Sequence, residues 1–345
     1  MATSLLLKPL AAIALATAWA APLVATEPTQ RPVNPAATPA AVALLNYLYE
    51  ISGKGTLAAQ HAPPLLASTR AASTLKQTRH YPAVLGFDFG FSPAGTWDGI
   101  NFRQQIVDEA IRRHREGFIV TLMWHAVRPI EDEPVEFDTS IQAKLTPEQW
   151  RDLVTPGTEV NERWKSQVDV IAFFLRQLRD AGVPVLWRPY HEMNGGWFWW
   201  GRSDGDNGYK KLYRMLYDRL VRFHHLDNLI WVFNANEIRE DVDPYSDYYP
   251  GADVIDVLAT DVYKNGFAAS DYEQLLALAA GKPIALGEVG HVPTIEILRS
   301  QPRWVWFMCW GDPITNWKEA AAIRASFDSA EVLTWEELPW VKQKP

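Results

Sequence analysis

The segment VPVLWRPYHEMNGGWFWWG, residues 183–201, changes character halfway along. Its first half is a continuous apolar run, the pattern expected for a parallel strand that is covered on both faces. The polar residues His191, Glu192 and Asn194 follow where that strand would end, and a run of aromatic rings begins at Trp197. We therefore interpret the segment as a buried strand that delivers a carboxylic acid to a ring-lined site.

Further apolar runs of the same kind are spaced along the chain, at 55–61, 83–89, 118–125, 229–236, 254–263, 282–290 and 303–310. Several are separated by stretches with helical periodicity, at 101–117, 166–182 and 209–224. Eight strands that alternate with helices predict an α/β fold of the (β/α)8 or TIM-barrel type, which typically needs about 250 residues. The alternative is a doubly wound open sheet, and it is disfavoured because no G-x-G-x-x-G follows the first strand.

Polar residues gather at the predicted strand ends, whereas the strand bodies are apolar. In a (β/α)8 barrel the carboxyl ends of the strands build the active site. The residues at these ends are Gln60, His61, Asp88, His125, His191, Glu192, Asn234, Asn236, Asp261, Tyr263, Glu288 and Trp310. Glu192 and Glu288 end the fourth and seventh strands, so we expect both carboxyl groups to point into one mouth.

Two carboxyl groups across a cleft with aromatic walls fit the hydrolysis of a glycosidic bond. One group must stay protonated to act as the acid, and a poorly hydrated pocket raises a carboxyl pKa. Glu192, close to Trp197, suits that role. Glu288 would attack the anomeric carbon as a carboxylate, and Arg188 on the fourth strand would supply a compensating positive charge.

A metal-dependent hydrolase is a competing interpretation of the same residues. The H-E-x-x-H zinc motif fails because Gly195 stands where the second histidine is needed. His125 and His191, with Asp88 or Asp261, would be the remaining candidate ligands. Catalytic zinc sites usually show a clearer set of three ligands, so we expect neither a metal nor another cofactor.

Composition limits the possible partners. The net charge of −8 leaves no basic excess for nucleic acid or anionic lipid. Cys309 is the single cysteine, which excludes an intramolecular disulfide and a cysteine-based metal cluster. The 16 tryptophans fit either a core or stacking platforms for sugars. We expect a monomer whose partner is a polysaccharide or oligosaccharide.

The first residues predict export. Lys8 precedes an apolar, Ala-rich run, and Ala18-Trp19-Ala20 fits a cleavage site, so residues 1–20 are interpreted as a signal peptide; an uncleaved anchor is the alternative. A Pro/Ala/Thr-rich leader is expected over 21–45, followed by a single catalytic domain over 46–345. The expected location is extracellular or periplasmic.

The segment RPYHEMNGGWFWWG (188–201) closely resembles the fourth-strand signature of glycoside hydrolase family 26, whose members are mostly β-mannanases. AAQH and GFDF resemble the first two strands of that family, and WVFNAN, DVLATDVY, ALGEVG and WVWFMCW resemble its fifth to eighth strands. The resemblance runs from about residue 52 to 325 and is most specific at 188–201.

The resemblance implies a retaining mechanism with Glu192 as the acid/base and Glu288 as the nucleophile. It implies sugar contacts from His125, a subsite wall at Trp197, a hydrogen bond from Tyr263 to the nucleophile and a sugar floor at Trp310. The full candidate substrate-binding set is His125, His191, Trp197, Tyr263, Trp310, Arg188, Asn194, Asp88 and Trp150.

The implied substrate is β-1,4-mannan, attacked within the chain. β-1,3-xylanases and mixed-linkage β-glucanases belong to the same family, and they remain alternatives. A non-catalytic carbohydrate-binding barrel is a further alternative, although binding alone needs neither Glu192 nor Glu288. Several family mannanases carry an arginine after the Trp310 position, whereas Gly311 follows it here, so the next subsite outward must be built differently.

Overall fold

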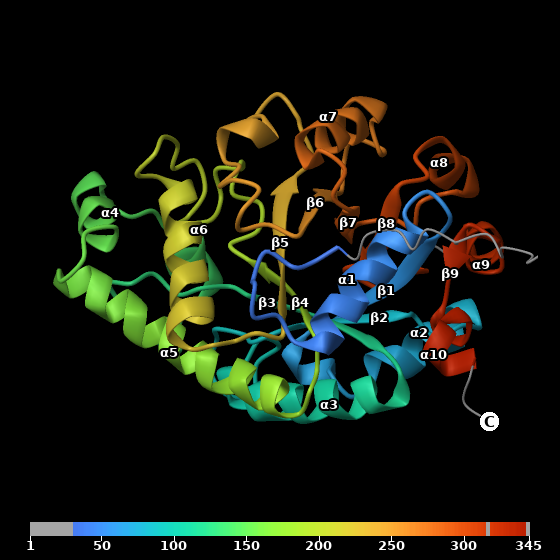
Figure 1. Ribbon diagram of the computed structural model, residues 1–345, viewed down its shortest axis with the longest axis horizontal. Helices are drawn as coiled ribbons and strands as arrows, with labels where there is room; N and C mark the ends of the chain where they lie inside the picture. Colours follow the sequence, from blue (N-terminus) through green and yellow to red (C-terminus); the bar gives the residue numbers. More distant parts are fainter. Residues whose placement is uncertain (1–29, 315–317, 343–345) are drawn as a thin grey trace, which may run out of the picture.

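The sheet of the computed structural model, which describes residues 30–314 and 318–342, closes on itself (Figure 1). All neighbouring strands are parallel, and β1 pairs with both β2 and β8, which completes the barrel. The predicted (β/α)8 barrel is confirmed, and each of the eight apolar runs coincides with one of its strands to within a few residues: β1 (Thr56–Ala62), β2 (Val84–Asp88), β3 (Ile119–Trp124), β4 (Val185–Pro189), β5 (Leu229–Asn236), β6 (Val257–Val262), β7 (Ile284–Val289) and β8 (Trp304–Cys309).

A short strand, β9 (Val332–Leu333), was not predicted. It pairs with the first residues of β1 at Thr56 and Leu57. Two residues carry too little periodicity to be distinguished from a loop in a sequence.

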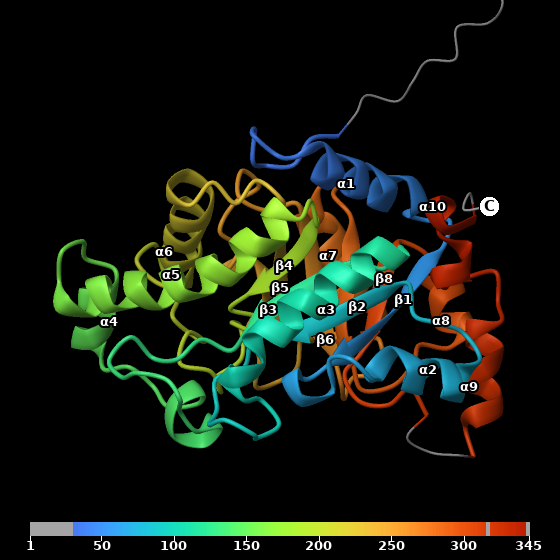
Figure 2. The same cartoon turned by 90° about the horizontal axis from the view of Figure 1, so that it is seen from below.

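Helices cover the outside of the barrel, as Figure 2 shows for α3 and α5 across β2, β3 and β4. Their bounds are α1 (Pro39–Ile51), α2 (Arg70–Thr78), α3 (Arg103–Glu116), α4 (Pro147–Leu153), α5 (Glu159–Asp180), α6 (Tyr209–Tyr217), α7 (Ala269–Ala279), α8 (Ile295–Ser300), α9 (Ala320–Phe327) and α10 (Pro339–Lys342). Short 3-10 or π-helical turns lie at Pro64–Leu66, Ile100–Phe102, Phe137–Ile141, Asp218–Phe223, Tyr245–Asp247 and Trp335–Glu337. None of these described helices is both long and apolar enough to cross a bilayer.

The helix predicted over 166–182 is the second part of a longer one. Helix α5 begins at Glu159, where the Thr158 side chain accepts a hydrogen bond from the Asn161 backbone N–H as an N-cap. Its buried face includes Trp164, Val168 and Leu175. The predicted stretch 209–224 is likewise helical, as α6 followed by the π-helical turn Asp218–Phe223.

Helix α1 closes the amino-terminal end of the barrel. Its side chains Leu44, Leu45 and Leu48 join a buried cluster with strand residues such as Ile230 and Val257. Burying apolar side chains against the barrel stabilises the helix far more than its own propensity does.

The expected leader over 21–45 is wrong for the part that the structure describes. Thr38 caps α1, Pro39 occupies its first position, and the Val33 backbone N–H donates to the Asp256 carboxylate at 2.7 Å. The folded domain therefore includes residues 30–45. The Ala- and Pro-rich composition of this segment is typical of an unfolded leader. The same residue types also suit the first turns of a helix that has an N-cap and a buried apolar face, as α1 does. Residues 1–29, with the expected signal peptide, lie outside the described residues.

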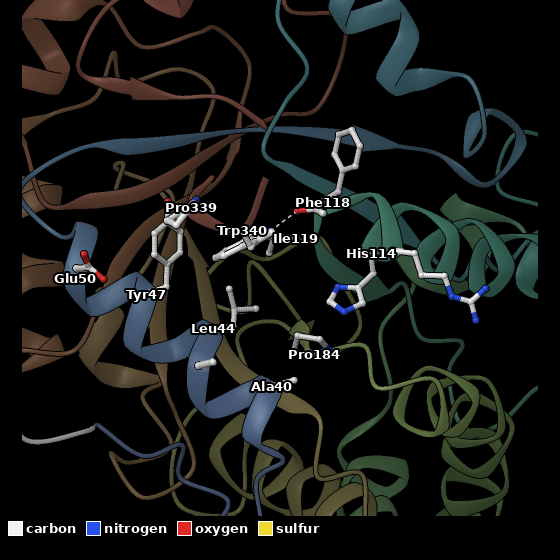
Figure 3. A pocket seen from close by; sticks show the side chains of 13 residues that line it. Ala40, Leu44, Tyr47, Glu50, His114, Phe118, Ile119, Pro184, Pro339 and Trp340 are labelled. Atoms are coloured by element: carbon white, nitrogen blue, oxygen red, sulfur yellow. Dashed lines mark hydrogen bonds between the residues drawn. The ribbon is translucent and has the colours of Figure 1, made fainter. Parts of the chain in front are cut away.

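The end of the barrel that α1 covers also carries a pocket of about 510 Å³ (Figure 3). Figure 3 shows Leu44 and Tyr47 of α1 on one side and His114 and Phe118 on the other, with Trp340 of α10 between them. Because the pocket adjoins the first residues of β3 and β4, it lies at the opposite end of the barrel from the carboxyl ends of the strands.

Candidate active site

A strained turn after β4 positions Glu192. Tyr190 and Glu192 both adopt left-handed backbone conformations, with φ of 49° and 54°. Such values are unfavourable for residues with a side chain, and they occur preferentially at functional sites. The turn is held to the next strand because the Glu192 backbone N–H donates to the Asn234 carbonyl at 2.8 Å.

The Glu192 carboxyl group is buried beside one indole. The Trp197 Nε1–H donates to Glu192 Oε2 at 2.6 Å. Gly195 allows this arrangement, since a Cβ there would lie 2.1 Å from the Trp197 ring. Burial, followed by the negative charge of Glu288, raises the pKa of Glu192 to about 8, and the bond from Trp197 acts in the opposite direction. Glu192 is therefore protonated at neutral pH.

Both oxygens of Glu288 are held by hydrogen-bond donors. Arg188 Nη2 donates to Oε1 at 2.8 Å, and the Tyr263 hydroxyl donates to Oε2 at 2.7 Å. The guanidinium offsets the cost of burying the negative charge, as a buried carboxylate requires. The carboxylate is thereby fixed in orientation while its neighbour Glu192 carries a proton.

Gly287 leaves space for the groups beneath Glu288. A Cβ at this position would lie 1.8 Å from Asn234 Oδ1 and 2.6 Å from Asp261 Oδ1. Asn234 Oδ1 in turn accepts a hydrogen bond from Arg188 Nε at 2.8 Å. A side chain at 287 would displace the group that orients Arg188.

Asp261 is a fully buried carboxyl group next to the pair. It is aligned with Glu288 across the β6–β7 register and lies 3.6 Å from Arg188 Nη2. Burial and the negative charge of Glu288 raise its pKa well above the usual range for an aspartate. The sequence placed Asp261 at a strand end facing the active site, and the only specific role it suggested for this residue was that of a metal ligand.

His191, Asp261 and Glu288 form the one cluster of potential metal ligands found among the described residues, with ligand atoms within 4.8 Å of one another. The Arg188 guanidinium already contacts both carboxyl groups of this cluster. A fixed cation therefore occupies the position where a metal would neutralise charge, and the donor set does not fit a metal site. The other candidate set of metal ligands includes His125 and Asp88, and these two side chains are hydrogen-bonded to each other.

The pKa values of the two histidines of the mouth are shifted in opposite directions. Burial lowers the pKa of His125, but Asp88, which lies 2.5 Å from its Nδ1, raises it, and the net pKa is above the usual value. Burial, with the charges of His125 and Arg188, lowers the pKa of His191 well below its usual value. His191 is neutral, and its buried Nδ1 has no hydrogen-bond partner.

The aromatic run after Glu192 is divided between site and core. Trp199 and Trp200 are buried, and their Nε1–H groups donate to the Ala126 and His191 carbonyls at 2.7 Å each. Phe198 stacks on Trp200 and packs against His191. Only Trp197 in this run bonds to the carboxyl pair, so the dense cluster mainly supports the strained turn.

Trp310 at the end of β8 lies parallel to the His61 ring, with centroids 3.8 Å apart. The sequence placed His61 at a strand end but suggested no role for it. The His61–Trp310 stack joins residues that are far apart in the sequence, and so does the hydrogen bond between Arg188 and Asn234. Neither contact therefore leaves a signal in the sequence.

Two of the candidate residues do not reach the carboxyl pair. The Asn194 side chain is buried and bonds to the backbone of Asn236 and Asp243, so it ties two loops together. Trp150 on α4 donates from Nε1 to the Asn207 carbonyl and packs against Trp199. Figures 1 and 2 both show α4 at the outer edge of the molecule. Trp150 therefore supports the outer loops.

Two carboxyl groups in contrasting surroundings, at the carboxyl end of a (β/α)8 barrel, put this chain among the barrel glycoside hydrolases. The sequence model of glycosyl hydrolase family 26 matches residues 33–337, and the chain belongs to that family.

Similar proteins agree with this assignment. A mannan endo-1,4-beta-mannosidase of Thermothelomyces thermophilus is 36% identical over 327 residues, which cover 88% of this chain and 62% of that protein. The structure of GH26A from Muricauda sp. MAR_2010_75 has 43% sequence identity and a TM-score of 0.85, and the match covers 88% of this chain and 99% of that one. A beta-mannanase from a symbiotic protist of the termite Reticulitermes speratus, solved with gluco-manno-oligosaccharide, has 29% identity and a TM-score of 0.78; the match covers 90% of this chain and 97% of that one. The chain spans less than two thirds of the Thermothelomyces relative's length.

Proposed function

We propose that the protein is a secreted, endo-acting β-1,4-mannanase that hydrolyses mannan, galactomannan or glucomannan with retention of configuration. The observation that carries the catalytic part is the contrast between a buried, protonated Glu192 and a Glu288 carboxylate bonded to Arg188 and Tyr263. The choice of mannan is supported by the names of the similar proteins.

In the first step, Glu288 attacks the anomeric carbon while Glu192 gives its proton to the departing glycosidic oxygen. The C–O bond to the leaving sugar breaks as an ester bond to Glu288 forms. The two donors on Glu288 set its direction of attack. The proton on Glu192 is available at neutral pH because burial and the charge of Glu288 raise its pKa.

In the second step, Glu192 is ionised and acts as the base. It takes a proton from a water molecule, which attacks the anomeric carbon and releases Glu288. Once Glu288 is esterified, its negative charge is gone and the pKa of Glu192 falls, because that charge is one cause of the raised value. The Trp197 N–H then stabilises the Glu192 carboxylate.

The sugar at the cleaved bond would lie over Trp310, whose other ring face is covered by His61. His125, whose Nδ1 lies against Asp88, keeps Nε2 for a further hydrogen bond, and neutral His191 places its Nε2 3.9 Å from Glu288 Oε1. These groups suit recognition of sugar hydroxyls. Export, a monomeric state and the absence of a cofactor are parts of the same proposal, and N-terminal sequencing of secreted protein tests the export.

The test is release of reducing sugar from galactomannan, glucomannan, β-1,3-xylan and lichenan, measured side by side with and without EDTA. We expect rapid fragmentation of the two mannans, unaffected by EDTA, and none by the Glu288→Ala variant. Preference for β-1,3-xylan or lichenan would overturn the substrate assignment. Loss of activity in EDTA would favour a metal-dependent hydrolase, and no hydrolysis of any of them would favour a binding barrel.

A further inference from the structure

The pocket at the amino-terminal end of the barrel has no part in the mechanism described above. Its volume of about 510 Å³ lies in the range of sites that hold small ligands. It is lined by residues of α1, α3 and α10, together with residues at the start of β3 and just before β4. Because the catalytic carboxyl groups lie at the other end of the barrel, a ligand in this pocket would leave the mouth free.

A tryptophan that is held in position yet partly exposed stands in this pocket (Figure 3). Trp340 exposes 36% of its surface. Its Nε1–H donates to the Gly117 carbonyl at 2.7 Å, and the Tyr47 ring packs against it with centroids 5.0 Å apart and planes at 71°. The indole is therefore fixed before any ligand arrives, which lowers the ordering cost of binding.

A glycine allows α10 to approach the end of α3. Gly117 has a φ of 109°, and a Cβ there would lie 2.6 Å from Val341 Cγ2 and 3.5 Å from Trp340 Cδ1. Leu338, immediately before α10, is fully buried in the cluster that joins α1 to the barrel strands. Helix α10 is thus a fitted part of the domain, and it presents Trp340 at this end of the barrel.

Hydrogen-bonding groups accompany the aromatic ring. Burial lowers the pKa of His114, although the Phe118 backbone acts in the opposite direction, so this imidazole is neutral at pH 7. A neutral imidazole has one donor and one acceptor nitrogen. Burial, followed by the charges of Glu50 and Glu337, raises the pKa of Tyr47 to about 12, so its hydroxyl keeps its proton. Glu50 itself adds carboxylate oxygens to the lining. These groups suit a hydroxylated ligand.

Charge and size decide among the possible occupants. Among the described residues of the lining, Glu50 and Arg115 carry opposite charges and His114 is neutral, so the pocket matches an uncharged ligand. The net charge of −8 on the chain further disfavours an anion. A second copy of the chain would need a patch of about 800 Å² on each partner, whereas this site is a recess of about 510 Å³. A neutral, hydroxylated polysaccharide fits these conditions.

We propose that this pocket is a second binding site for the polysaccharide on which the enzyme acts, in which the Trp340 indole stacks on a sugar ring and Tyr47, Glu50 and His114 hydrogen-bond its hydroxyl groups. The identity of the polysaccharide rests on the proposed function. Within a mesh of hydrated chains, the protein is held at one end of the barrel while the mouth at the other end cleaves. Two linked contacts retain the enzyme on a solid substrate better than one.

The test measures adsorption to insoluble mannan in the Glu288→Ala background, which does not consume the matrix. Adding Trp340→Ala should lower the partition coefficient about five-fold, the equivalent of one aromatic stacking contact. Ala43→Arg removes no contact of the lining but projects a long charged side chain from an exposed position on the pocket wall, so it should lower adsorption at least as much. With Glu288 intact, both changes should leave kcat/KM on a soluble manno-oligosaccharide within about two-fold, because the mouth is unaltered.

Phe173→Ala is the matched control, because Phe173 on α5 is also an exposed aromatic residue, at 56%, and lies outside this pocket. It should change neither adsorption nor oligosaccharide hydrolysis. Ala43→Arg keeps the proposal testable even if Trp340→Ala fails to fold. Unchanged adsorption in Ala43→Arg, or an equal loss on the oligosaccharide, would overturn the second site. Gel filtration that showed a dimer of the wild type and a monomer of Ala43→Arg would also overturn it, in favour of a second copy.

The second site and the proposed substrate fail separately. Hydrolysis of β-1,3-xylan in place of mannan would overturn the proposed substrate, and the same comparison of variants on insoluble β-1,3-xylan would still test the pocket. Conversely, rapid hydrolysis of mannan with adsorption that is insensitive to Trp340→Ala and Ala43→Arg would leave the proposed function standing and remove the second site.

Discussion

Replacing Trp197 by phenylalanine keeps an aromatic ring beside Glu192 but removes the N–H that donates to its carboxylate at 2.6 Å. That bond lowers the pKa of Glu192, so its loss should raise the pKa further above about 8. A hydrogen bond to a charged group contributes about 1.5–3 kcal/mol net. Because Trp197 is only half-buried, we take the lower end, and at about 1.4 kcal/mol per unit the shift is about one pKa unit upward.

The assay is the pH dependence of kcat/KM on an oligosaccharide, whose sugar leaving group needs the proton from Glu192. The limb on the alkaline side reports ionisation of the acid in the free enzyme, and it should move about one unit to higher pH in Trp197→Phe. Trp310→Phe removes the same N–H from a tryptophan of the mouth that does not bond to Glu192, so its alkaline limb should stay in place. An unchanged or lowered limb in Trp197→Phe would refute the reasoning.

Three further outcomes follow from the same contacts. Glu192 keeps its proton up to about pH 8 in the folded state but loses it near the ordinary pKa of a glutamate in the unfolded state, so the folded wild type loses stability as the pH rises between these two values. Glu192→Gln removes this ionisation and should therefore have a higher melting temperature than wild type. The difference should grow between thermal melts at about pH 5 and about pH 9. Gly287→Ala should lower both kcat and the melting temperature, because its Cβ would meet Asn234 Oδ1 at 1.8 Å, whereas Gly196→Ala, with its nearest contact at 3.4 Å, should leave both unchanged. Trp310→Ala should lower kcat/KM with little loss of melting temperature, whereas a large loss would mean that the ring serves the core.

The barrel could be predicted because each strand leaves a local trace. A strand that is buried on both faces is continuously apolar, and the polar residues that follow it mark its carboxyl end. The run 183–192 therefore predicts both β4 and the position of Glu192. The same logic fails where the signal is not local. The buried face of helix α1 is defined by its contacts with the end of the barrel that it closes, and its Ala-rich sequence alone resembles a leader.

The sequence predicted which residues lie in the candidate site, but not which contacts each of them makes there. Strand ends identified Glu192, Glu288, Arg188 and Tyr263 as neighbours, because the barrel brings all strand ends to one mouth. Which tryptophan bonds to the acid, and which ones merely support the turn, depends on side-chain directions after a left-handed residue at 192. No periodic pattern encodes such directions.

The most direct test of the account follows the anomeric configuration of the first sugar released. If Glu288 forms a covalent intermediate and Glu192 then activates water, two inversions return the β-linked sugar to the β configuration. Proton NMR of a manno-oligosaccharide digest, recorded before mutarotation, should therefore show the β-anomer first. The α-anomer as first product would mean a single displacement by water, and would contradict the assignment of Glu288 as nucleophile.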